Sequence, residues 1–257
     1  MFDKKKIINN HLRASNTKNE KVILFFHKLF EEVIDRLNIK KKNYKILELC
    51  AKNKFLDALL KKKKIESIVH RTVLCSDLNT LGKNVVMHDS DLSNIKEKDF
   101  DFCISLFPVV SQKNLSKLLL SSYRILSKEG RFIFIFHSMD SCIAIKNLFE
   151  NLFYIENKQS FLPCFDILSL GNYANSTGYK NILVDKSKYT ISSNKVDELW
   201  KFNRDLGESN YILNRNKSYI NKTKYKIFKD ALHDKLFKNK KIMSEISINF
   251  LTGKKTN

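Results

Sequence analysis

Three acidic residues lie where they could bind a ribose. Glu48, Asp77 and Asp89 are near the ends of three successive apolar segments that have the character of buried strands. The carboxyl ends of parallel strands meet at one edge of a sheet, and ligands of such sheets bind there. An acid after the second strand can accept hydrogen bonds from both ribose hydroxyls, which distinguishes a nucleoside site from a plain phosphate site. Each acid taken singly is equally typical of a cap between a strand and a helix.

The turn after the first of these strands contains no glycine. Its sequence runs from Cys50 through Lys52 to Lys54, and the whole chain has only 6 glycines. No G-x-G-x-x-G or G-x-x-x-x-G-K-S/T pattern is present, which argues against a dinucleotide or triphosphate cradle. If the turn requires positive φ, each non-glycine residue costs on the order of 1 kcal/mol. We therefore expect weakened binding of any group that approaches the backbone at this turn.

An alternating α/β framework is needed to bring these residues together. We expect strands at residues 45–50, 72–79, 84–89, 99–110 and 131–138, and helices at residues 19–37, 55–64 and 115–126. The first helix has an apolar face formed by Val22, Phe26, Leu29, Phe30, Val33 and Leu37. The alternation predicts a doubly wound, mostly parallel sheet with helices on both faces.

The composition narrows the class of protein. A chain of 257 residues with 43% hydrophobic residues can bury one large core. Neither an 18-residue apolar run nor a secretory signal is visible, so we expect a cytoplasmic protein without a membrane span. The 5 cysteines and 6 histidines show no disulfide framework and no metal-ligand spacing, so we expect reduced thiols and no metal.

The net charge of +20 raises the alternative of a nucleic-acid partner, because clustered lysines release counterions from phosphates. The basic residues are mostly lysines spread along the whole chain, and they accompany an excess of asparagine and isoleucine. Dense runs occur only near residue 5, at 40–42 and at 61–64. A solvated surface is therefore favoured over an RNA site.

In their order along the chain, these segments resemble the motifs of class I S-adenosylmethionine-dependent methyltransferases. The matching segments are ILELCAKNKF, TVLCSDLN, MHDSDL, FDFCISLF and RILSKEGRFIFIF, for the first to fifth strands in turn. The resemblance implies an α/β, Rossmann-like fold with a mostly parallel seven-stranded sheet and an α-rich C-terminal extension. It divides the chain into an N-terminal helical segment (1–39), a Rossmann core (40–192) and a helical extension with a final strand (193–257).

The later segments resemble one subgroup of that superfamily. The segments are FDILSLGNYANSTGYKNILVDKSKYTI, LWKFNRDLGESNYILNR and ISINFLTGKK. The subgroup contains the biotin-synthesis malonyl-carrier-protein methyltransferases and the methyltransferase-fold assembly factor of mitochondrial respiratory complex I. The Gly-Glu-Ser-Asn segment resembles the assembly-factor branch and its bacterial relatives.

The resemblance implies S-adenosyl-L-methionine as the cofactor and indicates which residues contact it. The cofactor-binding candidates are Glu48, Cys50, Lys52, Asp77, Leu78, Asp89 and Ser105. The acceptor-side candidates are Glu208, Ser209 and Asn210, although spacing alone favours a helix cap after a glycine at that segment. No catalytic residue can be named, because methyl transfer from a sulfonium depends mainly on positioning.

Three functions from different classes follow. The first is methyl transfer to a small-molecule or protein acceptor by a monomeric enzyme whose cofactor binding is weakened. The second is a respiratory complex I assembly factor, or a protein arginine hydroxylase-like protein, with a degenerate methyltransferase site and a complex I subunit as partner. The third, least favoured by the charge pattern, is a basic RNA-binding protein.

Overall fold

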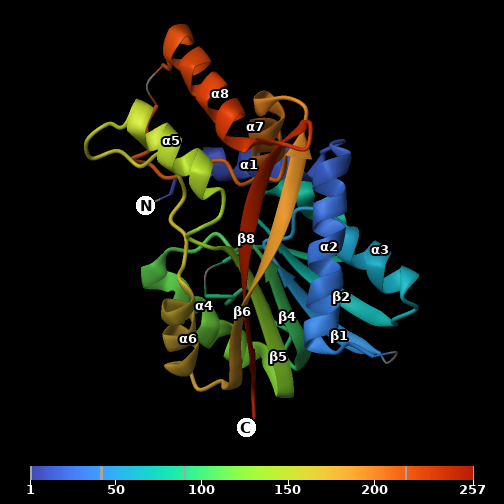
Figure 1. Cartoon of the computed structure of the whole chain (residues 1–257). Coiled ribbons are helices and arrows are strands. Elements are labelled where there is room, and N and C mark those ends of the chain that lie inside the picture. Colours follow the sequence, from blue (N-terminus) through green and yellow to red (C-terminus); the bar gives the residue numbers. More distant parts are fainter. Residues whose placement is uncertain (1, 41–42, 90, 218, 257) are drawn as a thin grey trace.

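The chain folds around a mixed β-sheet with helices on both faces (Figure 1). The computed structural model describes residues 2–40, 43–89, 91–217 and 219–256. The strands are β1 Tyr44–Leu49, β2 Ser67–Val73, β3 Asn84–Met87, β4 Phe100–Leu106, β5 Leu126–His137, β6 Lys180–Ser193, β7 Phe237–Lys238 and β8 Lys241–Lys254. The helices are α1 Lys4–Ser15, α2 Glu20–Leu37, α3 Phe55–Lys62, α4 Gln112–Ile125, α5 Ile143–Phe153, α6 Ile167–Asn175, α7 Val196–Asp205 and α8 Lys222–Leu236, with a 3-10 helix, η1, at Ser76–Leu81.

The order of strands in the sheet is β3-β2-β1-β4-β5-β8-β6, and the short β7 pairs with β8. The first five strands of the chain pair in parallel, so their carboxyl ends meet at one edge. Near-continuous apolar sequence in β4 and β5 suits strands that are covered on both faces. The predicted α/β class is therefore confirmed.

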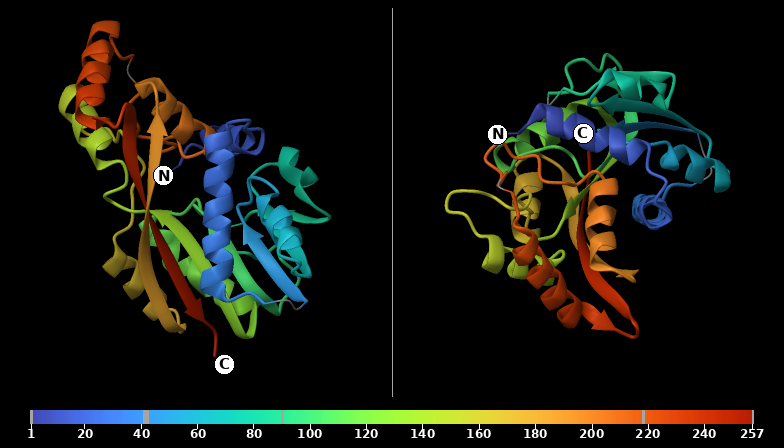
Figure 2. Two further views of the ribbon diagram at one scale, coloured as in Figure 1. Left: turned by 45° about the vertical axis from the view of Figure 1, so that its right-hand side comes forward. Right: turned by 90° about the horizontal axis from the view of Figure 1, so that it is seen from above.

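The other half of the sheet is antiparallel. β8 lies between β5 and β6 and runs opposite to both. Its pairing with β5 covers residues 248–254, whereas its pairing with β6 extends back to Ile242. The two long strands therefore continue beyond the sheet as a twisted ribbon (Figure 2, left).

Two groups of helices cover the sheet. α2 and α3 share one apolar cluster with side chains of β1, β4 and β5, and α4 and α6 share another with the alternate side chains of the same strands. The six apolar residues predicted to form one face of the first helix are all buried in α2. That helix and its core-facing stripe are confirmed.

The remaining helices lie above the carboxyl edge. α5, α7 and α8 pack around the projecting β6–β8 ribbon and form a third apolar cluster. α1 crosses the carboxyl edge of the parallel strands, where it contacts η1 and α7 (Figure 2, right). The carboxyl edge is therefore covered by chain segments from both ends of the sequence.

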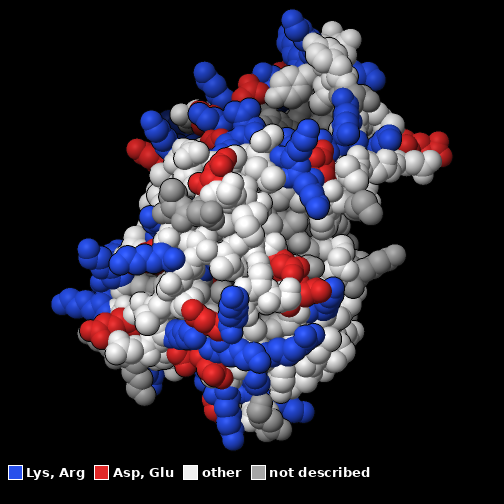
Figure 3. Space-filling model, turned by 180° about the vertical axis from the view of Figure 1, so that it is seen from behind, with Lys and Arg blue, Asp and Glu red and all other residues white. Residues whose placement is uncertain are grey.

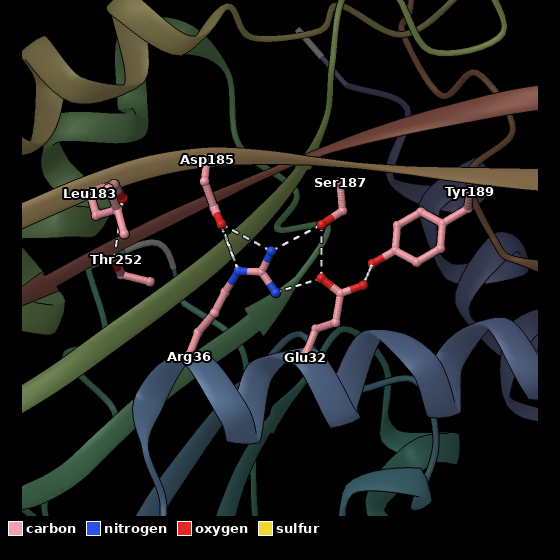
Figure 4. A network of polar contacts seen from close by, with 7 residues as sticks. All are labelled: Glu32, Arg36, Leu183, Asp185, Ser187, Tyr189 and Thr252. Carbon is pink, nitrogen blue, oxygen red and sulfur yellow. Dashed lines mark hydrogen bonds and ion pairs between the residues drawn. The ribbon is translucent and has the colours of Figure 1, made fainter.

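A polar network joins α2 to β6 on the outside of the sheet (Figure 4). Arg36 donates to Asp185 and, at 2.9 Å, to Ser187. Glu32 accepts hydrogen bonds from Arg36, Ser187 and Tyr189. Glu32 and Arg36 of α2 thus both have hydrogen-bond partners on β6, and these contacts hold the helix across the antiparallel strands.

The second predicted strand is misplaced. β2 covers Ser67–Val73, and Asp77 lies in η1 and not in the strand predicted at 72–79. The segment after Cys75 is rich in Ser, Asp and Asn, which favour tight turns over extended strand. The fifth strand starts earlier than the predicted residue 131, because β5 begins at Leu126 and passes Glu129 with a φ of 69°.

None of the helices in the described part of the chain combines the length and the apolar character needed to cross a membrane. Seen from behind, the lysines and arginines are scattered with acidic residues among them (Figure 3). On this face they do not merge into one continuous basic surface.

Gly207 joins the end of α7 to the underside of α1. Its φ is +83°, and an added Cβ would lie 2.9 Å from the Asn10 carbonyl oxygen and 3.0 Å from the Ala14 Cβ. We expect Gly207→Ala to lower the free energy of unfolding by more than the roughly 1–2 kcal/mol of left-handed backbone strain. Denaturant unfolding measures this loss. Gly171→Ala, in α6, is the control, because its Cβ would lie 3.8 Å from the Val184 Cγ2; equal stability of the two variants would contradict the close packing of α1.

Candidate functional site

The turn after β1 keeps one left-handed residue. Cys50 has a φ of 53°, while Lys54 has a φ of −106° and Lys52 is not among the residues with positive φ. The Cys50 N–H donates to the Thr72 Oγ1 at 2.9 Å, which fixes the turn against β2. The glycine requirement therefore applies to Cys50 alone, and the expected strain at the two lysines is absent.

Lys52 forms a buried ion pair with Glu208. The two side chains are 3% and 7% exposed. The positive φ of Gly207 turns the chain so that Glu208 points back toward the β1 turn. Burial raises the pKa of Glu208, and Lys52 opposes that rise. This pair links the cofactor-side and acceptor-side candidates, which are far apart in the sequence.

Of the three predicted edge acids, Glu48 is withdrawn into the sheet. It is 3% exposed and accepts a hydrogen bond of 2.9 Å from Arg71, its register partner in β2. Arg71 also donates to Asp57 and to the Leu81 carbonyl. Burial raises the pKa of Glu48 to about 7, against the opposing effect of Arg71. Glu48 is therefore held by Arg71 inside the sheet.

The other two acids differ in their availability. Asp89 accepts from the Asp91 N–H at 3.3 Å and from the Ser93 hydroxyl at 2.5 Å, so it caps the turn after β3. These hydrogen bonds lower the pKa of Asp89. Asp77 is exposed in η1, directly after β2, and forms no hydrogen bond or ion pair with the residues that the structure describes. It is the acid best placed to accept a ligand's hydroxyls.

Leu78 packs in an apolar cluster, and Ser105 forms a hydrogen bond to β1. Leu78 is buried with Ala51, Val73 and other apolar residues under α1. Ser105, on β4, is buried and donates its hydroxyl to the Leu49 carbonyl at 3.2 Å. Both contact residues beside the β1 turn, and their role in cofactor binding remains a prediction.

α1 covers this turn with polar side chains. Asn10 and His11 are buried, and Asn10 donates to the Ser209 carbonyl at 2.7 Å. Burial, with the charges of Lys52 and His88 nearby, lowers the pKa of His11, so this histidine is neutral. The cavity beside Cys50 and Lys52 measures only about 10 Å³. The space beside the turn after β1 is thus filled by the protein's own side chains.

Cys50 and His88 form a second polar contact under α1. The Thr72 hydroxyl lies 3.0 Å from the His88 Nδ1. Burial disfavours charge on both groups, but each favours the charge of the other, which lowers the pKa of Cys50 and raises that of His88. The pair ties the turn after β1 to the end of β3.

A larger cavity adjoins the Lys52–Glu208 pair. It has a volume of about 230 Å³ and lies between the end of β5, α5, α7 and the segment 160–164. Glu208, Ser209 and Asn210 all line it. The acceptor-side candidates therefore converge on one cavity, whose role remains a prediction.

His137 lines this cavity. Its ring stacks on Phe107 with centroids 4.4 Å apart, and burial lowers its pKa to about 3. The Nε2 lies 3.9 Å from the Glu208 carboxylate, but a neutral imidazole forms no ion pair there. No group of three or more His, Cys, Asp or Glu side chains in the described ranges could hold a metal ion.

Sequence reasoning missed the three histidines His11, His88 and His137. Each is an isolated histidine in an apolar or polar run, and none has a spacing typical of a ligand or catalytic group. Their place in the site becomes clear only in the structure, where α1, β3 and β5 meet at the carboxyl edge. The signal in the sequence was limited to the position of His88 and His137 at strand ends.

Comparison with known proteins supports the fold. No family model and no curated protein matches the chain. A candidate methyltransferase from Bacillus halodurans C-125 superposes with a TM-score of 0.58 at 10% identity, over 89% of this chain and 99% of that chain. The YcgJ protein from Bacillus subtilis gives 0.55 at 12% identity, over 90% and 99%.

A SAM-dependent methyltransferase from Archaeoglobus fulgidus gives a TM-score of 0.50 at 15% identity, over 89% of this chain and 94% of that chain. At such identities a structural likeness defines the fold alone. The chain therefore has the class I methyltransferase fold.

Proposed function

We propose that the protein binds S-adenosylmethionine and transfers its methyl group to a small-molecule or protein acceptor. The observation that carries the proposal is Asp77: an exposed carboxylate without a partner in the described chain, directly after β2. Leu78 and Ala51 share one apolar cluster, so η1 and the left-handed turn at Cys50 lie together. A ribose diol would bind to Asp77 at this edge.

The methionine end of the cofactor would bind at the Lys52–Glu208 pair. An amino-acid end carries one carboxylate and one ammonium, and the pair offers one charge opposite to each. Binding would exchange the internal ion pair for two ion pairs with the ligand. Because the pair is buried and closed, part of the binding free energy would be spent on opening it, which supports weakened affinity.

When bound, the cofactor supplies an activated methyl group on a sulfonium. The residues of this chain would bind, orient and shield it. Asp77 would hold the ribose, and α1, through the buried Asn10 and His11, excludes water from the turn. His137 is neutral and borders the cavity of about 230 Å³ where the acceptor would lie. Its low pKa makes it a poor base, so it would orient an acceptor group through a hydrogen bond and would not take its proton.

Titration calorimetry with S-adenosylhomocysteine tests the proposal. The wild-type protein should bind this product analogue, and Asp77→Asn should weaken binding by roughly ten- to a hundredfold, since a charge-assisted hydrogen bond contributes about 1.5–3 kcal/mol. Adenosine should lose affinity by a similar factor in the same variant. The two ligands together show whether the ribose is the group that Asp77 holds.

Asp230→Asn is the matched control for this titration. Asp230 is exposed on α8, away from β2, so the control should bind like wild type. An unchanged affinity in Asp77→Asn would remove the ribose assignment. Absence of any binding by wild-type protein would remove the methyltransferase proposal.

A protein-binding role without catalysis is the second candidate, and the closed turn favours it. A cavity of about 10 Å³ beside Cys50 holds no cofactor moiety unless the ion pair opens. An assembly factor for a respiratory complex, or a hydroxylase-like relative with a degenerate site, would keep the fold in this closed form. This candidate predicts no binding of S-adenosylhomocysteine by wild type.

A further inference from the structure

The cavity of about 230 Å³ carries an uneven set of charges. Lys146 and Arg204 both line it, and neither has a carboxylate within ion-pair distance in the described part of the chain. Lys146 donates only to the Met139 carbonyl and to the Cys164 thiol, at 3.3 and 3.4 Å. Glu208, the acid in the lining, is neutralised by Lys52. The cavity therefore has an excess of positive charge.

Uncharged polar groups in the lining add hydrogen-bond donors. Trp200 has an indole N–H that is buried and has no hydrogen-bond partner among the described residues. The amide of Asn203 and the hydroxyls of Ser160 and Ser209 lie around the same space. Such donors suit a ligand oxygen that carries negative charge.

Apolar side chains form another part of the lining. Ile145, Phe161, Leu162 and the ring of Trp200 border the cavity. Its volume of about 230 Å³ is below the roughly 300–1,000 Å³ of pockets for drug-sized ligands, so its occupant is small. An apolar wall opposite cationic donors fits a molecule with one anionic end and one short hydrocarbon part.

We infer that this cavity binds a small amphipathic organic anion, with Lys146 holding its charged end and Trp200 contacting its apolar part. Lys146 is half-buried at the start of α5, whereas Arg204 is exposed on α7 and adds attraction at longer range. That this anion is the methyl acceptor rests on the proposed function. Its binding does not, because no cofactor residue is needed to hold it.

Fluorescence of Trp200 provides a direct test, because it is the only tryptophan of the chain. Hexanoate, hexanol and hexylamine have the same apolar tail and differ in charge. Hexanoate should change the emission saturably, hexanol should bind at least about tenfold more weakly, and hexylamine should not bind. Equal affinity for the three, or no saturable change with hexanoate, would overturn the inference.

Two variants locate the binding charge. Lys146→Met should weaken hexanoate by about tenfold or more and leave hexanol unchanged. Lys235→Met replaces an exposed lysine in the last turn of α8 and should bind hexanoate like wild type. Hexanoate binding that is unaffected by Lys146→Met would remove Lys146 from the site and the inference with it.

The same protein also separates this inference from the proposed function. Hexanoate binding without S-adenosylhomocysteine binding leaves the anion site in place and removes methyl transfer. S-adenosylhomocysteine binding without hexanoate binding supports the proposed function and removes the anion site. Each result therefore contradicts only one of the two proposals.

Discussion

Lys52→Met is expected to destabilise the protein by about 3–5 kcal/mol, because it leaves the carboxylate of Glu208 buried without its cation. Methionine keeps most of the length and apolar volume of the lysine stem, so lost packing contributes little. Glu208 is 7% exposed and cannot recover its hydration without a movement of the loop after α7. Denaturant unfolding at neutral pH measures the loss.

The double variant Lys52→Met/Glu208→Gln isolates the charge. Removing both charges should recover more than half of the stability lost in the single variant, since a neutral amide is less costly to bury than a carboxylate. Thermal unfolding followed by circular dichroism can compare the four proteins of the cycle. If Lys52→Met and the double variant are equally unstable, the ion pair is not the origin of the effect.

Arg71→Met is expected to lower the free energy of unfolding by a similar amount, about 3–5 kcal/mol near pH 8, because it too leaves a buried carboxylate without its cation. Arg71 is 2% exposed and joins Glu48, Asp57 and the Leu81 carbonyl. Its removal leaves Glu48 buried with no counter-charge. Glu48 has a pKa of about 7 even with Arg71 beside it, and without Arg71 the pKa rises further.

The sign of the pH dependence follows from that rise. A carboxyl whose folded pKa is above its unfolded value binds a proton on folding, so its contribution is present at low pH and is lost as pH rises through the folded pKa. The deficit of Arg71→Met relative to wild type should therefore be smaller near pH 5 than near pH 8. Urea unfolding at both values measures it.

Glu48→Gln in the Arg71→Met background is the control. The amide does not titrate, so the additional deficit near pH 8 should disappear in the double variant. A deficit in Arg71→Met that is the same at both pH values would show that Glu48 is not the titrating group.

The framework of the sheet could be predicted because its signals are local. Each apolar run from β1 to β5 and the stripe of α2 is visible within a few residues, and their order defines the α/β class. Asp77 was correctly named as an edge acid, but its strand was misplaced because a short polar 3-10 helix has no periodic signature. The sequence raised the possibility of positive φ in the turn after β1, but with no glycine there it could not assign it to Cys50 rather than to Lys52 or Lys54.

The closure of the site could not be predicted, because it depends on contacts between distant residues. Lys52 and Glu208 were both named as candidates, yet no local pattern shows that residues 156 positions apart form an ion pair. α1 buries Asn10 and His11 together with Ile7 and Ala14, so half of its inner face is polar. Periodicity of apolar residues does not detect such a helix.

The place of β8 has a consequence for synthesis on the ribosome. Residues 242–254 lie between β5 and β6, so neither of those strands has its full set of partners until this last strand has been translated. Pairing across so large a sequence separation is slow, and until then one edge of β5 and one edge of β6 are open to other nascent chains. We therefore expect the nascent chain to be most prone to aggregation between translation of β5 and docking of β8.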